Sequence, residues 1–162
     1  LTGLYNRRFI EECIQREIDR ASRNSSSLII VMADLDHFKH INDNYGHDAG
    51  DAVLKSISQL FIGFRNGYDI VSRYGGEEFL FLLTDISQEN AFQRLEKLRL
   101  QIEDLKVETG GHVIDGLSIS IGAATFPEMG TEKEILINRA DEAMYLAKNN
   151  GRNQIAFYTP KL

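Results

Sequence analysis

Apolar side chains recur along the chain at two different spacings, which separate predicted helices from predicted strands. Apolar residues three and four positions apart predict helices over about 6–23, 38–44, 48–64, 87–105 and 131–149. Continuous or alternating apolar runs, rich in β-branched and aromatic residues, predict strands over about 28–34, 69–74, 79–83, 117–126 and 154–158. Strands and helices are mixed along the chain, so we expect an α+β fold in which helices pack on the faces of a sheet.

Polar residues at the ends of these patterns predict where helices begin, because their side chains can accept bonds from the free N–H groups of a first turn. Asn6 and Asp48 are expected to cap the first helix and the helix of residues 48–64, and Ser87 to open a third. Thr131 followed by Glu134 is a capping-box pattern and predicts the start of the last helix.

A pair of glycines, Gly75-Gly76, separates the predicted strands 69–74 and 79–83. Glycine adopts positive φ at low cost, so the pair predicts a two-residue hairpin turn. A tight hairpin joins antiparallel strands, which excludes a wholly parallel sheet. The expected sheet is therefore mainly antiparallel and flanked by helices.

Length and composition narrow the class of protein. The chain has 162 residues, which fits one domain, and 43% hydrophobic residues, which excludes wholesale disorder. Its one cysteine, Cys13, excludes an intramolecular disulfide framework, and its longest apolar run, 28–33, is too short to span a membrane. These features fit a cytoplasmic domain. The net charge of −6 counts against nucleic acid as a partner.

Two acidic clusters are candidates for a metal-binding or catalytic site. Asp34-Leu35-Asp36 stands where an apolar strand ends, and Glu77-Glu78 follows the glycine turn. Carboxylates at a strand end and at a neighbouring hairpin can share a divalent cation, and hard oxygen ligands suit Mg²⁺. Each cluster taken singly is equally typical of a solvated turn.

Other metal and nucleotide motifs do not fit. An EF-hand starting at Asp34 would need glycine and glutamate where Lys39 and Tyr45 stand. His37, His40 and His47 lack the second cysteine or the helical pairing that a zinc site would use. The sequence also has neither a P-loop pattern nor a G-x-G-x-x-G segment after a strand.

The segment Gly75–Phe79 reads GGEEF, which resembles the signature of the GGDEF family of diguanylate cyclases. Further blocks that are similar to the family's occur in the expected order. They are LTGLYNRR at 1–8, DLDHFKHIND at 34–43, YGHDAGD at 45–51, SIG at 120–122, ADEAMYLAK at 140–148 and GRN at 151–153. The resemblance covers essentially the whole chain.

The resemblance implies a fold like the palm of nucleotide cyclases and polymerases. It implies condensation of two GTP molecules into cyclic di-GMP with release of pyrophosphate, in a homodimer whose two GTP-loaded sites face each other. It also implies that 1–162 is a single GGDEF domain. Because Leu1 already lies inside a family block, we expect a piece of a longer multidomain bacterial protein, with an N-terminal sensor or receiver domain and with membrane anchoring of the parent left open.

Metal and catalytic roles carry over by position. Asp34, the Leu35 carbonyl and Glu77 match the family's ligands for Mg²⁺ or Mn²⁺, and Lys39, Glu77 and Glu78 match its catalytic positions. Glu77 also matches the proposed general base for the 3′-hydroxyl. The two roles of Glu77 compete, since a carboxylate bound to a cation is a poor base, and the ligand role is favoured.

Substrate contacts carry over in the same way. Asn42 and Asp51 match the residues that read guanine, and His47 matches a position beside the base or ribose. Gly75 and Gly76 leave room for the nucleotide. Three cations match phosphate contacts, namely Lys39, Lys148 and Arg152. Arg73 has two possible roles, a phosphate contact or a surface charge on an edge strand.

One position departs from the family. Many members carry Arg-x-x-Asp upstream of the signature, where the product binds and inhibits. Asp69 stands at the aspartate position, but Asn66 replaces the arginine and Arg65 is displaced by one residue. Without the guanidinium fork, we expect product inhibition to be weak or absent.

Two other functions compete with catalysis. One is a non-catalytic regulatory domain that binds GTP or cyclic di-GMP, and the other is a structural dimerisation module. Degenerate relatives of the first kind lose signature carboxylates, whereas Asp34, Glu77 and Glu78 are all present. The second gives no reason for Asp34, Asn42, Asp51 and Glu77 to occur together, so an active diguanylate cyclase is the favoured interpretation.

Overall fold

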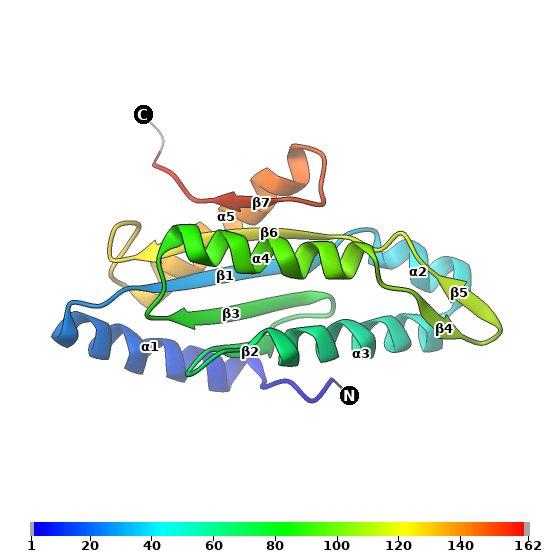
Figure 1. The fold of residues 1–162 in the computed structure, drawn as a ribbon, viewed down its shortest axis with the longest axis horizontal. Coiled ribbons are helices and arrows are strands. Elements are labelled where there is room, and N and C mark those ends of the chain that lie inside the picture. The colour runs from blue at the N-terminus through cyan, green and yellow to red at the C-terminus, as the bar shows by residue number, and fades with distance from the viewer. Residues whose placement is uncertain (1, 161–162) are drawn as a thin grey trace.

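A five-stranded sheet in the order β2-β3-β1-β6-β7 separates two layers of helices (Figure 1). The structure is a computed structural model that describes residues 2–160; Leu1, the expected start within a family block, lies outside them. The elements are α1 (Arg7–Asn24), β1 (Leu28–Leu35), α2 (Phe38–Tyr45), α3 (His47–Phe64), β2 (Ile70–Arg73), β3 (Glu78–Thr84), α4 (Gln88–Glu103), β4 (Val107–Thr109), β5 (His112–Ile114), β6 (Ile119–Phe126), α5 (Lys133–Asn149) and β7 (Ile155–Phe157).

The sheet is mainly antiparallel, as predicted. Its central strand β1 pairs antiparallel with β3 on one side and with β6 on the other, and β2 pairs antiparallel with β3. Among the strands of residues 2–160, β6 pairs parallel with the short edge strand β7, and an isolated parallel bridge joins Tyr5 to Ser72 of β2. Asp34, near the end of β1, lies opposite Glu78 of β3 and Ser120 of β6.

Both faces of the sheet are covered, which explains why β1 is apolar without alternation. Every residue of β1 is buried. Ile29 and Val31 belong to the core formed with α3 and α4, whereas Ile30 and Met32 belong to the core formed with α1 and α5. Side chains two apart on a strand share a face, so Asp34 faces the same side as Ile30 and Met32, toward α5.

Helix α5 lies directly against β6 at a glycine. A Cβ on Gly122 would lie 2.6 Å from the Cα of Met144 and would also overlap the backbone N of Met144 and the carbonyl O of Ala140. Only glycine therefore permits this backbone-to-backbone approach. The approach fixes where the last turn of α5, which carries Lys148, lies relative to the end of β1.

The glycine pair of the signature does not form the predicted two-residue turn. β2 ends at Arg73 and β3 begins at Glu78, with Arg73 opposite Phe79, so the connection is the four-residue loop 74–77. Neither Gly75 nor Gly76 has a positive φ, so that prediction is wrong. The register of β2 with β3 sets the longer loop, which needs no left-handed residue.

A glycine turn of the predicted kind occurs elsewhere. Gly110 and Gly111, with φ of 55° and 79°, join β4 to β5. Positive φ at both central residues is the requirement of the tight hairpin turn. The hairpin was not predicted from the sequence, although a Gly-Gly pair between two short β-prone runs was its signal.

Two of the predicted helix caps are confirmed. The Asn6 side chain accepts a bond from the N–H of Phe9 at 2.9 Å, and the Ser87 hydroxyl accepts one from the N–H of Asn90 at 3.1 Å. Each side chain therefore satisfies an otherwise free donor in the first turn of its helix.

The other two caps are wrong. α3 begins at His47, directly after Gly46 ends α2, so Asp48 lies inside the first turn, where its charge still opposes the helix dipole favourably. α5 is preceded by Glu132, which makes no side-chain cap bond, so Thr131 does not form a capping box.

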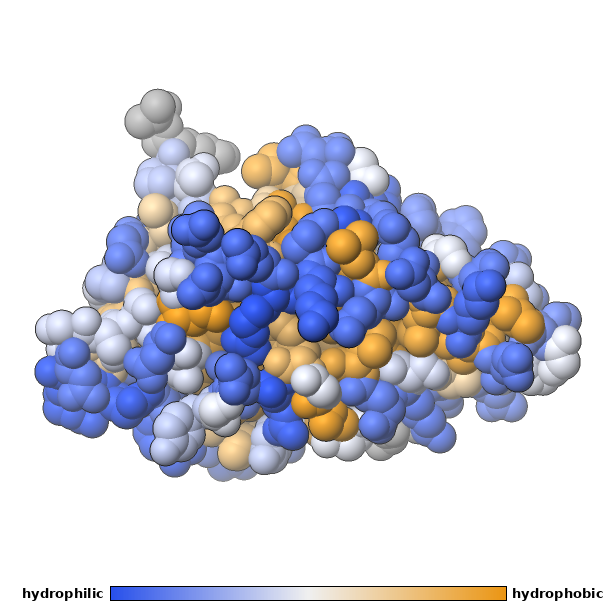
Figure 2. Space-filling view, in the orientation of Figure 1, coloured by the Kyte–Doolittle hydropathy of each residue, from blue (hydrophilic) through white to orange (hydrophobic). Residues whose placement is uncertain are grey.

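Phe92 and Leu100 of α4 are exposed apolar residues. Figure 2 shows this face of the molecule as mainly hydrophilic with scattered hydrophobic patches. Single exposed apolar residues are normal on protein surfaces. Among residues 2–160, each helix falls short of the length and apolar character that crossing a bilayer would need.

Candidate active site

Three carboxylates gather at one end of the central strands. Asp34 is the next-to-last residue of β1, and its register partner is Glu78 of β3. The backbone N–H of Leu35 donates to the carbonyl O of Glu77 at 3.2 Å, which brings the loop 74–77 beside the end of β1. The structure thus brings together the predicted metal residues Asp34, Leu35 and Glu77, with Glu78 next to them.

Asp34 is a buried carboxylate with an incomplete set of partners. The Nζ of Lys148 lies 3.1 Å from its Oδ1, yet no well-aligned hydrogen bond reaches that buried oxygen. At this N–O separation the ammonium and the carboxylate form a close ion pair. Burial is the main cause that raises the pKa of Asp34 to about 6; Lys148 opposes the rise, and Glu77 and Glu78 add to it.

These groups fit a hard divalent cation. A buried oxygen without an aligned donor and nearby acidic side chains are the surroundings in which a cation would offset the cost of burying charge. Within residues 2–160, no three His, Cys, Asp or Glu side chains form a ready metal cluster. The expected ligand set does not require one, since it consists of two carboxylates and the carbonyl of Leu35.

The signature loop is held by its own neighbours. Nε and Nη2 of Arg73 both donate to the carbonyl O of Gly76, at 3.1 and 2.7 Å. The hydroxyl of Tyr74 donates to Glu11 of α1 at 2.7 Å. Arg73 therefore closes the loop, a role that the sequence did not predict. A Cβ on Gly76 would meet nothing within 4 Å, so its side faces open space.

The predicted guanine readers lie at the junction of α2 and α3. Gly50 of α3 allows Asn42 of α2 to approach closely, because a Cβ at Gly50 would lie 3.0 Å from the Asn42 Cγ and 3.1 Å from the ring of Phe38. Asn42 is half-buried, and Asp51, next to Gly50, is exposed. The packing of α2 on α3 thus holds Asn42 close to the residue that precedes Asp51.

The remaining predicted contacts surround the same end of the sheet. Lys39 and His47 are exposed on the first turns of α2 and α3, and α2 begins three residues after β1 ends. Lys148 is in the last turn of α5, where it reaches Asp34. Arg152 follows α5 in a left-handed conformation with φ of 65°, and its side chain is exposed.

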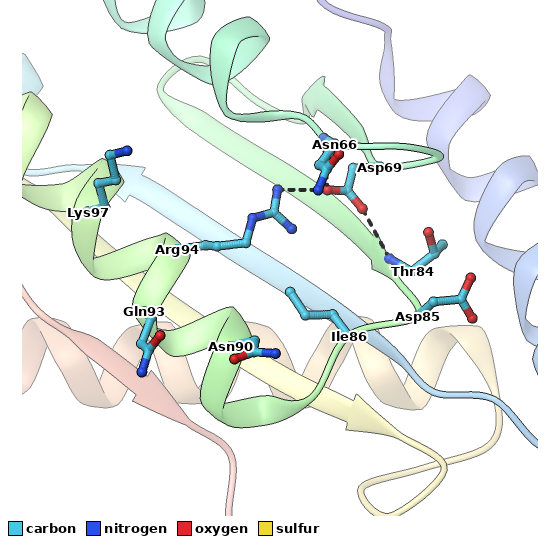
Figure 3. Close-up of a pocket in the computed structure, with 9 residues that line it drawn as sticks. All are labelled: Asn66, Asp69, Thr84, Asp85, Ile86, Asn90, Gln93, Arg94 and Lys97. Atoms are coloured by element: carbon cyan, nitrogen blue, oxygen red, sulfur yellow. Dashed lines mark hydrogen bonds and ion pairs between the residues drawn. The ribbon is translucent and has the colours of Figure 1, made fainter.

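Asp69 lies away from this site, near the opposite end of β3, beside a cavity of about 480 Å³ (Figure 3). Its buried carboxylate already has partners. Arg94 of α4 forms an ion pair with Oδ2 at 2.8 Å, the N–H of Asn66 donates to the same oxygen at 3.1 Å, and the N–H of Thr84 donates to Oδ1 at 3.2 Å. Arg94 was missed because it is distant from Asp69 in sequence.

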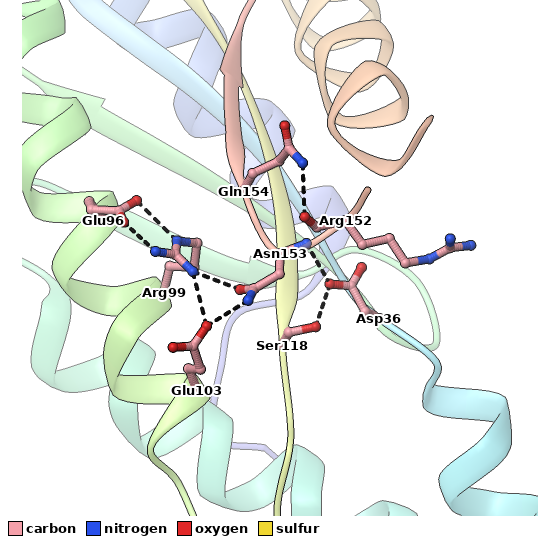
Figure 4. A network of polar contacts seen from close by, with 8 residues as sticks. All are labelled: Asp36, Glu96, Arg99, Glu103, Ser118, Arg152, Asn153 and Gln154. Carbon is pink, nitrogen blue, oxygen red and sulfur yellow. Dashed lines mark hydrogen bonds and ion pairs between the residues drawn. The ribbon is translucent and has the colours of Figure 1, made fainter. Parts of the chain in front are cut away.

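The second aspartate of the first acidic cluster has surroundings different from those of Asp34. Asp36 is buried, and its carboxylate accepts a bond from the hydroxyl of Ser120 at 2.6 Å. It also accepts bonds from the hydroxyl of Ser118 and the N–H of Asn153, at 2.7 and 3.0 Å (Figure 4). The network was not predicted from the sequence. Its partners follow 82 or more residues after Asp36, and only the SIG and GRN blocks pointed to those segments.

The chain is similar in sequence to known proteins. The family model described as "Diguanylate cyclase, GGDEF domain" matches residues 1–154. The diguanylate cyclase DosC of Escherichia coli K12 is 40% identical over 162 residues, which is 100% of this chain and 35% of DosC. The chain therefore spans about a third of the length of this curated relative.

Known structures are similar as well. The GGDEF domain of YfiN (TpbB) from Pseudomonas aeruginosa is 32% identical with a TM-score of 0.94, covering 99% of this chain and 100% of that one. The active GGEEF domain of a diguanylate cyclase from Vibrio cholerae is 30% identical with a TM-score of 0.89, covering 98% and 100%. With a family model over nearly its whole length, the chain belongs to the GGDEF family of diguanylate cyclase domains.

Proposed function

We propose that this chain is a catalytic domain that condenses two GTP molecules into cyclic di-GMP. The observation that carries the proposal is the meeting of Asp34, Glu77 and Lys148 where β1 ends, with an oxygen of Asp34 buried and without an aligned donor. A structural module would have no use for an acidic edge of this kind. The diguanylate cyclase names of the relatives support the same activity.

In the proposed complex, Asp34, the Leu35 carbonyl and Glu77 hold Mg²⁺ or Mn²⁺. When bound, the cation supplies charge neutralisation on the phosphate oxygens. Lys39, Lys148 and Arg152 bind the triphosphate, and their charges favour departure of pyrophosphate. The open side of Gly76 leaves room for the nucleotide against the loop, and the backbone pairing of Glu78 with Asp34 places a further catalytic carboxylate next to the cation-binding residues.

Guanine selection is assigned to the junction of α2 and α3. Asp51 accepts bonds from N1–H and the 2-amino group, and Asn42 donates to O6 or N7, with His47 beside the base or ribose. Adenine lacks the donors that Asp51 needs, and leaving a carboxylate unpaired discriminates strongly against an analogue. GTP is therefore the expected substrate rather than ATP.

The reaction needs two chains. Each 3′-hydroxyl attacks the α-phosphorus of the GTP held by the other chain. A phosphorus–oxygen bond forms there, the bond to the oxygen bridging the β-phosphorus breaks, and pyrophosphate and the hydroxyl proton leave. We propose a homodimer for this geometry. In the parent protein, a further sensor or receiver domain would control how often the two sites face each other.

Product inhibition at the cavity beside Asp69 is proposed to be weak. The arginine expected there is Asn66, and the Asp69 carboxylate is engaged by Arg94 and by two backbone N–H groups. To bind a guanine base of the product, the Asp69 carboxylate would first have to give up those partners.

The test is to incubate the purified chain, joined to a dimeric coiled coil, with GTP and Mg²⁺ and to quantify cyclic di-GMP and pyrophosphate by chromatography. Glu77→Gln and Asp34→Asn are expected to lower turnover at least about 100-fold, since each removes charge at the acidic edge. Glu12→Gln removes the same charge from the exposed surface of α1 and is expected to leave turnover unchanged. No product from the forced dimer would overturn the proposal and favour a non-catalytic nucleotide-binding domain.

A further inference from the structure

We infer that Asp36 is a positioning residue that fixes the spacing between the acidic edge and the phosphate-binding Arg152. The inference rests on the proposed function for the role of Arg152. It assigns to the second aspartate of the Asp34-Leu35-Asp36 cluster a task separate from that of the first, namely to hold the turn that follows α5.

The bonds of Asp36 are already committed within the protein. Its Oδ1 accepts from the hydroxyl of Ser120 at 2.6 Å, and its Oδ2 accepts from the hydroxyl of Ser118 and the N–H of Asn153 at 2.7 and 3.0 Å. An ionised carboxylate has about four acceptor sites, so three of them are used. Asp36 is only 4% exposed. It therefore has little capacity left for a cation, unlike Asp34.

The turn that Asp36 holds has an unusual backbone. Arg152 and Asn153 both adopt positive φ, at 65° and 49°. Two successive left-handed residues other than glycine persist only where neighbouring groups fix them. The N–H of Asn153 to Asp36 is one such bond, and the N–H of Arg152 to the carbonyl O of Ala147 at 3.0 Å is another. The bond to Asp36 is the one that ties the turn to β1.

Helix α4 holds the same residue from the other side. Arg99 donates to Oδ1 of Asn153 at 2.8 Å, and Nδ2 of Asn153 donates to Glu103 at 2.6 Å. Arg99 is itself paired with Glu96 and Glu103. Asn153 is thus held through its backbone by Asp36 and through its side chain by α4, as Figure 4 shows.

The result is a fixed base for an exposed cation. Figure 4 shows the side chain of Arg152 extending away from the network, past Asp36. Asp34 and Asp36 are separated by one residue, so the segment that presents the acidic edge also holds the base of Arg152. An exposed guanidinium binds a phosphate well only if the backbone that carries it is held in the right position.

A double-mutant cycle tests this role in the dimerised chain. Asp36→Asn removes the charge and leaves one acceptor oxygen for the three donors, which weakens the bond from the N–H of Asn153. It is expected to raise the KM for GTP about tenfold, without changing the Mg²⁺ concentration that gives half-maximal rate. In an Arg152→Ala background, Asp36→Asn should change KM less than twofold, because residues that act together are not additive. In a Lys39→Ala background, the full tenfold effect should remain. Additive effects with Arg152, or a shifted Mg²⁺ requirement, would overturn the inference.

Hydrogen exchange tests the same role without activity. Peptides covering 150–157 are expected to exchange at least tenfold faster in Asp36→Asn than in the unaltered chain. Asp69→Asn is the matched control, because Asp69 is another buried carboxylate with three donors, at the other end of the sheet, and should leave this exchange unchanged. Unchanged exchange in Asp36→Asn would refute the inference. Failure to make cyclic di-GMP would instead refute the proposed function.

A milder variant covers the case in which Asp36→Asn does not fold. Asn153→Gly keeps the backbone N–H and tolerates positive φ, but removes both side-chain bonds to α4. It should raise both the exchange of 150–157 and the KM for GTP, by less than Asp36→Asn in each case. A variant that leaves both quantities unchanged would contradict the role of Asn153 in holding the turn.

Discussion

Replacing Gly122 by alanine tests the link between packing and the active site. The added Cβ would lie 2.6 Å from the Cα of Met144 and would overlap two further backbone atoms of α5. Non-bonded carbon atoms prefer about 3.5–4.0 Å, so α5 has to retreat from β6 by at least about 1 Å. No flexible side chain is available to yield instead.

The cost of that movement is large for a single methyl group. Overpacking a well-filled core costs about 1–3 kcal/mol, and a clash with backbone belongs at the upper end of that range. A loss of about 3 kcal/mol would lower Tm by about 6–12 °C for a domain of this size. The retreat also carries Lys148 away from Asp34, now 3.1 Å apart, so the loss of activity should exceed the loss of folded protein.

The assay is urea unfolding followed by circular dichroism, together with GTP turnover per folded molecule at a temperature where both proteins are native. Gly63→Ala is the matched control, because a Cβ there meets nothing within 4 Å in the last turn of α3. It should be neutral or stabilise the protein by up to about 1 kcal/mol. A loss below 1 kcal/mol in Gly122→Ala, with unchanged turnover, would refute the packing argument.

Three further predictions concern individual side chains. Burial raises the pKa of Asp34 to about 6, so between about pH 4 and 6 the native state holds a proton that the unfolded state has released. Without divalent metal, the free energy of unfolding should therefore fall by at most about 3 kcal/mol as pH rises through this window. Urea unfolding of Asp34→Asn should lack that fall, and parallel pH profiles would contradict it. Added cyclic di-GMP should inhibit turnover only weakly. Half-inhibition at a sub-micromolar concentration, if Asp69→Ala abolished it, would refute the prediction of weak inhibition at this cavity. Tyr74→Phe removes the bond to Glu11 that ties the signature loop to α1, so it should destabilise the domain by about 1 kcal/mol in urea and lower turnover, whereas the exposed control Tyr145→Phe should do neither.

Continuous local patterns made much of the fold predictable. The eight buried residues of β1 and the apolar faces of the helices are properties of short segments, so their elements follow from the sequence. The helix caps were harder. At the start of α5 the N-cap is Glu132 and no side chain caps the first turn, so the capping-box pattern of Thr131 and Glu134 falls out of step with the helix start.

The two glycine pairs show the same limit. Gly75-Gly76 and Gly110-Gly111 offer identical local chemistry, yet only the second pair adopts positive φ at both residues. The strand register, with Arg73 opposite Phe79, determines the length of the first loop, and register depends on the whole sheet.

Some residues of the candidate site were predictable from the sequence and others were not. The family blocks pointed to Asp34, Glu77 and Lys148, and the structure brings them to one end of the sheet. The blocks did not distinguish the surroundings of Asp36 from those of Asp34, because Ser118, Ser120 and Asn153 come near only after folding. The same is true of Arg94, whose partner Asp69 is on another element.

Gly76 is a residue whose identity the fold itself does not require. Its φ is not positive, and a methyl group there would touch no atom of the chain. Replacing such a glycine by alanine should stabilise the domain by about 0.4–1 kcal/mol, since the unfolded chain loses freedom. The absence of a side chain at Gly76 therefore matters only to a ligand that binds from outside the chain. If Gly76→Ala is more stable and less active, Gly76 lies on the surface that contacts the nucleotide.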